Sequence, residues 1–361
     1  MSEVRRTQVL VIGGGQAGLA AGYHLRRAGL DFAILDGATA PGGAWQHYWD
    51  SLRLFSPAGY SSLPGRPMPQ QAGPGAPPGR QAGGRYPDAA HVANYLSEYE
   101  KRYDLPVHRP VRAESVERSE AGLFTRTDQG TWHSDALVLA TGTWERPFVP
   151  AVPGRREFTG RQLHTYGYRG ADDFAGKRVV VVGGGNSGAQ IAADLHGVAT
   201  VRWVTQRTAR FLPDDIDGRA LFEIATRRVQ DDGPRISDLG DIVATAPVRA
   251  ARTAGLTAHP MFDHLTATGP VCADGTTWPA DAVIWCTGFR PHLPPTGLRR
   301  TRGRIPVDGT RAVEDERIHL LGYGDWTGPA SATLIGVGRT ARAAVEQIRA
   351  LPARPESNSF P

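Results

Sequence analysis

QVLVIGGGQAGLAAG, residues 8–22, is the stretch that decides the fold. The run VLVI has the character of a buried strand, and Gly13, Gly15 and Gly18 then lead into a helical pattern. Glycines at this spacing let the backbone turn tightly and approach a pyrophosphate, which the helix N-terminus attracts. The next strand ends at Asp36, where a carboxylate accepts hydrogen bonds from ribose hydroxyls. The stretch predicts a βαβ unit that binds a dinucleotide.

A second turn, RVVVVGGGNSGAQ at residues 178–190, repeats this pattern with one change. At the position equivalent to Asp36 lies Gln206, followed by Arg207. A carboxylate there would repel a 2′-phosphate, whereas a neutral side chain beside a guanidinium accepts one. We therefore predict a site for NADPH, with NADH allowed because Gln206 can bind a bare ribose; the alternative for Arg207 is an ordinary exposed arginine. The residues assigned to this site are Gly183, Gly185, Asn186, Ser187, Gly188, Gln206 and Arg207, with Thr287 and Gly288 of a later Thr-Gly turn.

The order of apolar runs predicts an α/β fold with two Rossmann-like domains, the second inserted in the first. We expect the first dinucleotide-binding domain at residues 1–160 and 286–361 and the second, the NAD(P)H domain, at 161–285. Residues 64–87 are too rich in Pro and Gly for regular structure and are consistent with a cover over the site or a surface insertion.

Composition excludes several classes of protein. The 361 residues are 40% hydrophobic and 21% charged, which is ordinary for a globular chain. The longest aliphatic runs are far below the roughly 20 residues of a membrane helix, and the N-terminus lacks a signal-peptide core, so we expect a cytoplasmic protein without membrane contact. Cys272 and Cys286 form no C-x-x-C pair and are expected to be inert core thiols. The basic run at 299–304 is interpreted as a solvated loop, without nucleic-acid binding.

The first dinucleotide site is expected to hold FAD, because a nicotinamide in the second site needs a bound partner that passes electrons. The segment at 319–339 supports this: Asp325 follows a strand and can bind ribitol hydroxyls, although alone it would be a turn residue, and the next helix begins near Thr333. The acidic run Asp214, Asp215 and Asp217 is assigned to turns and helix capping, so no metal is predicted.

A resemblance to a known family rests on the connector between the two turns. FTGRQLHTYGY, residues 158–168, whose apolar spacing fits neither helix nor strand, matches the fingerprint of class B flavin-containing monooxygenases at Phe158, Gly160, His164 and Tyr168. The segments PGGAWQHYWDSLRLFSPAGYSSLPG, FLPDDIDGRALFE and GYGDWTGPASATLIGVGR resemble the small bacterial ArsO-like members of this class. The similarity covers residues 8–350. It implies that the connector is a hinge placing the nicotinamide against the flavin, with a structural role for His164.

What the resemblance implies is an FAD-dependent monooxygenase that consumes NAD(P)H. One oxygen atom of O2 would pass, through a flavin C4a-hydroperoxide, to a small soft nucleophile such as a sulfide or an amine. The flavin carries the chemistry, so no catalytic side chain is assigned. Gly42, Gly43, Trp45, Gln46 and His47 match the family segment beside the flavin ring. The full set assigned to FAD is Gly13, Gly15, Gln16, Ala17, Gly18, Asp36, Gly43, Ala44, Trp45, His47, Gly324, Asp325 and Thr333.

Alternatives remain open at this point. Tyr168, in place of the Trp typical of Baeyer-Villiger enzymes, favours heteroatom oxygenation over ketone oxygenation. Phe55 replaces the asparagine of the eukaryotic S-L-x-x-N segment, which leaves open how the hydroperoxide is stabilised. A reductase or oxidase of the same fold lacks its usual dithiol here, and a redox sensor without turnover would not need the complete set of motifs. The partners expected are O2 and a small molecule, and a homodimer is left open.

Overall fold

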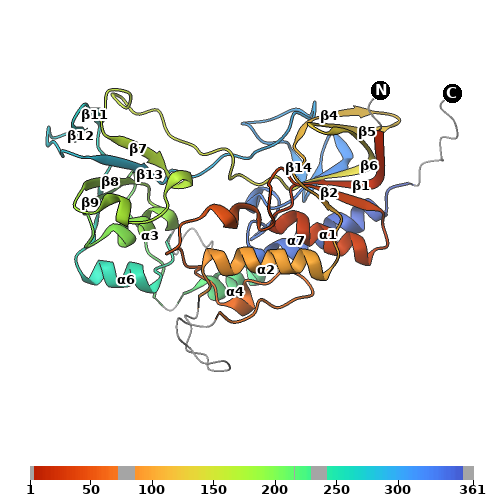
Figure 1. Cartoon of the computed structure of the whole chain (residues 1–361), viewed down its shortest axis with the longest axis horizontal. Coiled ribbons are helices and arrows are strands. Elements are labelled where there is room, and N and C mark those ends of the chain that lie inside the picture. Colours follow the sequence, from red (N-terminus) through yellow and green to blue (C-terminus); the bar gives the residue numbers. More distant parts are fainter. Residues whose placement is uncertain (1–3, 72–85, 215, 229–241, 353–361) are drawn as a thin grey trace.

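The computed structural model describes residues 4–71, 86–214, 216–228 and 242–352. Two sheets lie at opposite ends of an elongated molecule, and extended segments cross between them (Figure 1). The larger sheet holds strands from both ends of the chain, and the smaller sheet holds strands from its middle. The predicted α/β class with two Rossmann-like units is confirmed.

The larger sheet has a parallel centre in the order β16-β6-β1-β2-β3. Val9 pairs with Phe32 on one side and Ala136 on the other, so β1 is central. Antiparallel strands β15 and β14 extend the sheet beyond β16, and the antiparallel pair β5 and β4 branches from β6. The strands are β1 (Val4–Ile12), β2 (Phe32–Leu35), β3 (Val107–His108), β4 (Ala113–Ser119), β5 (Gly122–Thr127), β6 (Gly130–Leu139), β14 (Val307–Asp308), β15 (Arg311–Ala312) and β16 (Asp315–Leu320).

The smaller sheet is parallel, in the order β10-β9-β8-β13-β7. Its strands are β7 (Arg161–His164), β8 (Arg178–Val182), β9 (Thr200–Thr205), β10 (Ala258–Pro260) and β13 (Ala282–Trp285). A hairpin of β11 (His264–Thr266) and β12 (Gly269–Val271) stands beside it. Because β6 belongs to the larger sheet and β7 to the smaller one, the strands support a domain boundary near residue 161, which stays a prediction.

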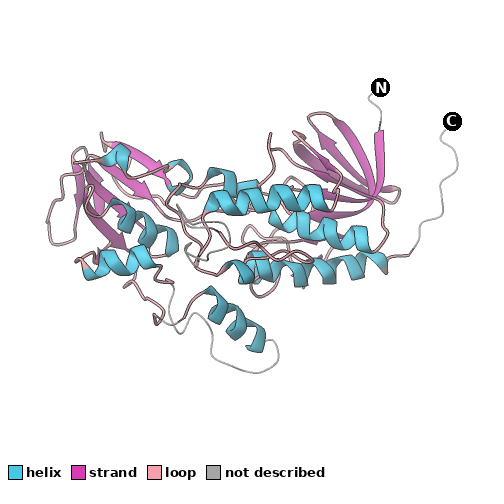
Figure 2. Cartoon of the chain, turned by 60° about the horizontal axis from the view of Figure 1, so that its bottom comes forward, coloured by secondary structure: helices cyan, strands magenta, loops and turns pink. Residues whose placement is uncertain are grey.

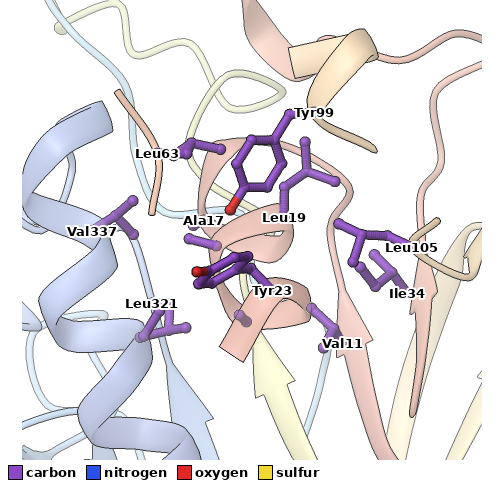
Figure 3. Packing of buried hydrophobic residues seen from close by; sticks show 14 of the residues in the cluster. Val11, Ala17, Leu19, Tyr23, Ile34, Leu63, Tyr99, Leu105, Leu321 and Val337 are labelled. Atoms are coloured by element: carbon purple, nitrogen blue, oxygen red, sulfur yellow. The ribbon is translucent and has the colours of Figure 1, made fainter. Parts of the chain in front are cut away.

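Helices bury the apolar residues of the sheets. Figure 2 shows α1, α2 and α7 running beside one another next to the larger sheet. In Figure 3, Tyr23 of α1 lies among Val337 of α7, Leu321 and Tyr99 of α2, and these residues belong to one buried cluster. The helices are α1 (Gln16–Arg27), α2 (Ala89–Arg102), α3 (Asn186–Leu195), α4 (Gly218–Arg228), α6 (Ala246–Thr253) and α7 (Leu334–Arg349).

Two sequence expectations need correction. The connector was expected to be irregular, but Arg161–His164 forms β7, because it pairs in parallel with β13 along the sheet edge. Local spacing of apolar residues cannot reveal a strand that exists through a partner far away in the chain. Cys286 is buried and burial raises the pKa of its thiol to about 12, as an inert thiol requires. Cys272, in contrast, is only partly buried rather than a core residue.

Other expectations concern surfaces and loops. Residues 299–304 are all exposed, as a solvated loop should be. Of the Pro/Gly-rich stretch, 72–85 lies outside the described residues. No helix in the described ranges is long and apolar enough to cross a bilayer.

Candidate functional site

The first glycine turn leaves no room for side chains. Gly13 has φ +114°, and a Cβ placed on it would lie 2.3 Å from the carbonyl oxygen of Ala140. A Cβ on Gly18 would lie 1.8 Å from the carbonyl oxygen of Gly13. Contacts this short are forbidden, so the turn requires glycine at both positions. The close packing brings β1, the start of α1 and the end of β6 together around one groove.

The first turn of α1 has free backbone donors. Its N-cap is Gly15, no side chain caps it, and no acidic residue lies in the first turn. By contrast, Asp88 caps α2 and Thr333 caps α7 with side-chain oxygens. Uncapped N–H groups at a helix N-terminus are suited to an anion, because the helix dipole favours negative charge there. The turn fits the pyrophosphate of a dinucleotide.

A groove extends from this turn in both directions. One end lies at the end of β2, beside Asp36, and the other lies among aromatic rings. The residues that line it are Ile12–Ala17, Leu35–Ala38, Gly43–Trp45, His47, Tyr48, Val111–Ala113, Ala140–Glu145, Phe289, His292, Pro294, Leu321, Gly322 and Ala332. Most of the residues assigned to FAD therefore line one groove: Gly13, Gly15, Gln16, Ala17, Asp36, Gly43, Ala44, Trp45 and His47.

Asp36 lies at the β2 end and is only 7% exposed. Its Oδ1 accepts a hydrogen bond from the backbone N–H of Ala38 at 3.1 Å. Its Oδ2 accepts two bonds from Arg109, from Nε at 3.0 Å and from Nη2 at 2.8 Å. Arg109 also donates to both carboxylate oxygens of Glu100, at 2.8 and 3.0 Å. Arg109 and Glu100 were missed by the sequence analysis, because no motif links them to Asp36.

At the aromatic end of the groove, two consecutive hydrogen bonds join Trp45, Gln16 and the backbone of Ala332. Gln16 Nε2 donates to the carbonyl oxygen of Ala332 at 2.8 Å, and Trp45 Nε1 donates to Gln16 Oε1 at 2.9 Å. Tyr48 packs on Trp45 with ring centroids 5.3 Å apart. Burial raises the pKa of Tyr48 to about 12, so its hydroxyl stays protonated at neutral pH. A flat, neutral surface of this kind suits an isoalloxazine ring.

Trp144 connects the aromatic end to the second unit. Its ring contacts Tyr48 at 4.6 Å, Tyr166 of the connector at 5.2 Å and Phe289 at 5.0 Å between centroids. Phe289 follows β13, and the backbone N–H of Phe148 donates to the carbonyl oxygen of Gly288 at 3.0 Å. The ring end of the groove therefore lies where the chain segments cross between the sheets.

The third FAD segment is arranged differently from the expectation. Gly322 and Ala332 line the groove, whereas Gly324, Asp325 and Thr333 do not. Asp325 is exposed in a short turn. Thr333 uses its hydroxyl to cap α7, accepting from the N–H of Gly336 at 3.0 Å. The position of Asp325 fits the alternative given for it, a turn residue, and not a ligand of the ribitol hydroxyls.

The second glycine turn repeats the geometry of the first. A Cβ on Gly183 would lie 2.2 Å from the carbonyl oxygen of Cys286, and one on Gly188 would lie 2.2 Å from that of Gly183. The N-cap of α3 is Gly185, again without a side-chain cap. Gln206 and Arg207 are exposed beyond β9, where a ribose phosphate would lie.

Other residues assigned to this second site make bonds within the protein. Asn186 Oδ1 accepts from the backbone N–H of Val243 at 2.9 Å. Thr287 Oγ1 donates to the carbonyl oxygen of Phe148 at 2.5 Å, and Gly288 accepts from the connector. Ser187 follows Asn186 in the first turn of α3. The Thr-Gly turn thus supports the crossing segments.

The connector is pinned by its fingerprint residues. His164 Nε2 lies 2.9 Å from the carbonyl oxygen of Gly288, and Tyr168 donates its hydroxyl to Asp194 Oδ2 at 2.6 Å. Phe158 and Tyr168 are buried. A Cβ on Gly160 would lie 2.3 Å from the ring of Phe158 and 2.7 Å from the carbonyl oxygen of Asp281. All four residues serve packing at the edge of the smaller sheet.

In the acidic run, Asp214 is an exposed turn residue and Asp217 caps a helix. Asp217 Oδ1 accepts from the N–H groups of Arg219 and Ala220 at the start of α4. Asp215 lies outside the described residues. No cluster of three or more candidate metal ligands occurs in the described part of the chain.

Comparison with known proteins agrees with this geometry. A family profile described as pyridine nucleotide-disulphide oxidoreductase matches residues 10–217. A solved flavin-containing monooxygenase from Stenotrophomonas maltophilia is 47% identical, over 96% of this chain and 99% of that one, with a TM-score of 0.86. The chain belongs to the class B flavin-containing monooxygenases. This family uses FAD and NADPH, and the chain is a flavin-dependent oxidoreductase of this kind.

Curated relatives extend the comparison. The uncharacterized oxidoreductase CzcO of Bacillus subtilis is 28% identical over 94% of this chain and 98% of its own length. A probable indole-3-pyruvate monooxygenase, YUCCA4 of Arabidopsis thaliana, is 31% identical over 60% of this chain and 51% of its own length. This monooxygenase chain thus spans about half the length of that plant relative. The only cysteines of the monooxygenase, Cys272 and Cys286, lie outside the region that the disulphide oxidoreductase profile matches.

Proposed function

We propose that this monooxygenase transfers one oxygen atom of O2 to a small soft nucleophile, a sulfide or an amine, at the expense of NADPH, with NADH as a weaker donor. The carrying observation is the groove itself, which begins at an acidic ribose site, passes an uncapped helix start and ends among aromatic rings at the crossing to the second unit. Bound FAD, reduced by the nicotinamide, supplies the activation of O2 and the transfer of one oxygen atom.

Different residues of the groove would bind different parts of the two cofactors. Gly13, Gly15, Gln16 and Ala17 would hold the pyrophosphate, and Asp36 would hold the adenosine ribose. Trp45 and its neighbours would carry the flavin ring and keep water from it. The second turn, with Gln206 and Arg207, would take the nicotinamide dinucleotide. We retain the division into residues 1–160 with 286–361 and 161–285 as part of this proposal.

The charge distribution supports a neutral or weakly basic substrate. The Asp, Glu, Lys and Arg side chains that line the groove are Asp36, Arg112 and Glu145. Arg112 and Glu145 pair with each other at 2.8 Å, and Arg112 lies beside Gly37, near the ribose end. The lining at the ring end, Trp45, Tyr48, Trp144 and Phe289, is therefore aromatic, and His47, stacked on Trp144, is a polar group beside it.

The test is a product analysis under ¹⁸O₂. The FAD-loaded enzyme is given NADPH with methyl phenyl sulfide, trimethylamine or cyclohexanone in separate reactions. Sulfoxide or amine oxide carrying one ¹⁸O is expected. Lactone from the ketone as the main product would favour Baeyer-Villiger oxygenation. NADPH consumption that yields hydrogen peroxide alone would favour an oxidase, and no turnover would favour a redox sensor.

A further inference from the structure

Arg109 and Asp36 form a buried ion pair at the ribose end of the groove. Both side chains are 11% exposed, and Arg109 lies between two carboxylates, Asp36 and Glu100. Burial disfavours the guanidinium charge, but the hydrogen bonds to Glu100 and Asp36 outweigh it and leave the pKa of Arg109 raised. The three side chains come from the end of β2, from α2 and from the residue after β3. Pairing across three elements fixes the position of the carboxylate.

The hydrogen bonds already made by Asp36 limit what it can accept. A carboxylate has about four acceptor sites, two on each oxygen. Oδ2 receives both bonds from Arg109, and Oδ1 receives one from the N–H of Ala38. One site remains, on Oδ1. One of the two ribose hydroxyls could therefore donate to Oδ1, while Oδ2 is held by the guanidinium.

The pair also changes the charge that a ligand meets. FAD brings a doubly negative pyrophosphate to the neighbouring turn, and an isolated carboxylate nearby would repel it. Arg109 places a positive charge against Asp36 in a site with little water to screen it, so that Asp36, Glu100 and Arg109 together carry a net charge of −1 instead of −2. Glu100 holds Arg109 from the other side, so the guanidinium cannot swing toward the pyrophosphate and leave Asp36.

We propose that Arg109 is a positioning residue for FAD, which presents Oδ1 of Asp36 to the adenosine ribose. The inference rests on the proposed FAD site. It predicts that Arg109 acts on the recognition of ribose hydroxyls and has no effect on the ring end of the groove. A role in folding alone would affect every ligand of the groove equally.

The experiment titrates apoprotein with FAD and with an FAD analogue whose adenosine ribose lacks both hydroxyls. Binding is followed by flavin fluorescence. The wild type is expected to prefer FAD by about tenfold or more, since a hydrogen bond to a charged group is lost in the analogue. Arg109→Met should weaken FAD binding about tenfold and reduce the preference to below about twofold. Arg109→Lys, which cannot donate from two positions of a planar fork, should fall between them.

The matched control is Arg317→Met. Arg317 pairs with Asp315 through Nε and Nη2 at 2.7 Å each, in the same sheet region but away from the groove. This variant should keep the wild-type preference. An unchanged preference in Arg109→Met, or equal losses for FAD and its analogue, would overturn the positioning role. A wild type without any preference would instead contradict the ribose site at Asp36. Glu100→Gln provides a milder variant if Arg109→Met does not fold.

Discussion

His164 and Gly288 are joined by a hydrogen bond of 2.9 Å between the imidazole Nε2 and the carbonyl oxygen. The other ring nitrogen, Nδ1, accepts from the backbone N–H of Tyr166 at 3.0 Å, so the proton is on Nε2 and the ring is neutral. Burial lowers the pKa of His164, in agreement with this state. The imidazole therefore links the end of β7 to the segment after β13 by a hydrogen bond. Because both nitrogens are hydrogen-bonded to the backbone, the ring is poorly suited to proton transfer.

We expect His164→Ala to uncouple NADPH consumption from oxygenation. The ring of His164 packs edge-on against Phe289 at 4.8 Å, and Phe289 packs on Trp144 at the ring end of the groove. Loss of the imidazole would loosen the crossing and misplace the nicotinamide relative to the flavin. FAD content should be unchanged, while hydrogen peroxide per NADPH rises and sulfoxide falls. Both yields are measured in the same reaction.

The comparison variant is His259→Ala. His259 lies in β10 and packs on Trp278, away from the crossing. Its coupling should equal that of the wild type. Unchanged coupling in His164→Ala, with normal flavin content, would restrict His164 to a local structural role.

Asp36→Ala should weaken FAD retention. The substitution removes the ribose acceptor and leaves Arg109 with one carboxylate partner, Glu100. A hydrogen bond to a charged group contributes about 1.5–3 kcal/mol, so the Kd for FAD should rise by about tenfold or more. Asp315→Ala breaks a comparable pair with Arg317 outside the groove and should retain FAD. Normal FAD affinity in Asp36→Ala would remove Asp36 from the site.

The sequence predicts those parts of the fold that depend on contacts between residues close together in the chain. Gly13, Gly18, Gly183 and Gly188 are required by close approaches within a strand-turn-helix unit, and spacing alone reveals them. Arg109 is different, because its partner Asp36 lies 73 residues away in the chain. The strand β7 likewise depends on pairing with β13. Asp325 matched the sequence pattern of a flavin-binding segment, but the turn that holds it lies outside the groove lining. The direction of this turn depends on the three-dimensional fold, and the local sequence does not reveal it.

Stability should fall between pH 6.5 and about 4 through His319. The residue is fully buried, and burial, with a smaller effect of Arg311, lowers its pKa from 6.5 to about 4. The unfolded chain takes up a proton below pH 6.5 while the folded chain does not, so the free energy of unfolding decreases by roughly 3 kcal/mol over this window. His319→Asn should be less stable at pH 7 and show a shallower pH dependence in urea titrations. His264→Gln, at a partly exposed position in β11, serves as control, and an unchanged slope in His319→Asn would contradict the assignment.

Arg207 should determine the preference for NADPH over NADH. It is exposed beside Gln206 beyond β9, and no hydrogen bond or ion pair to another described residue engages its guanidinium. A free guanidinium at this position can bind a 2′-phosphate through charge-assisted hydrogen bonds worth about 1.5–3 kcal/mol.

Arg207→Ala should therefore raise KM for NADPH about tenfold or more and leave KM for NADH nearly unchanged, and higher salt should mimic part of the effect. The matched control is Arg178→Ala in the same sheet, whose guanidinium is paired with Asp281, and it should change neither KM. Equal increases for both cofactors in Arg207→Ala would show that Arg207 binds a part common to both dinucleotides.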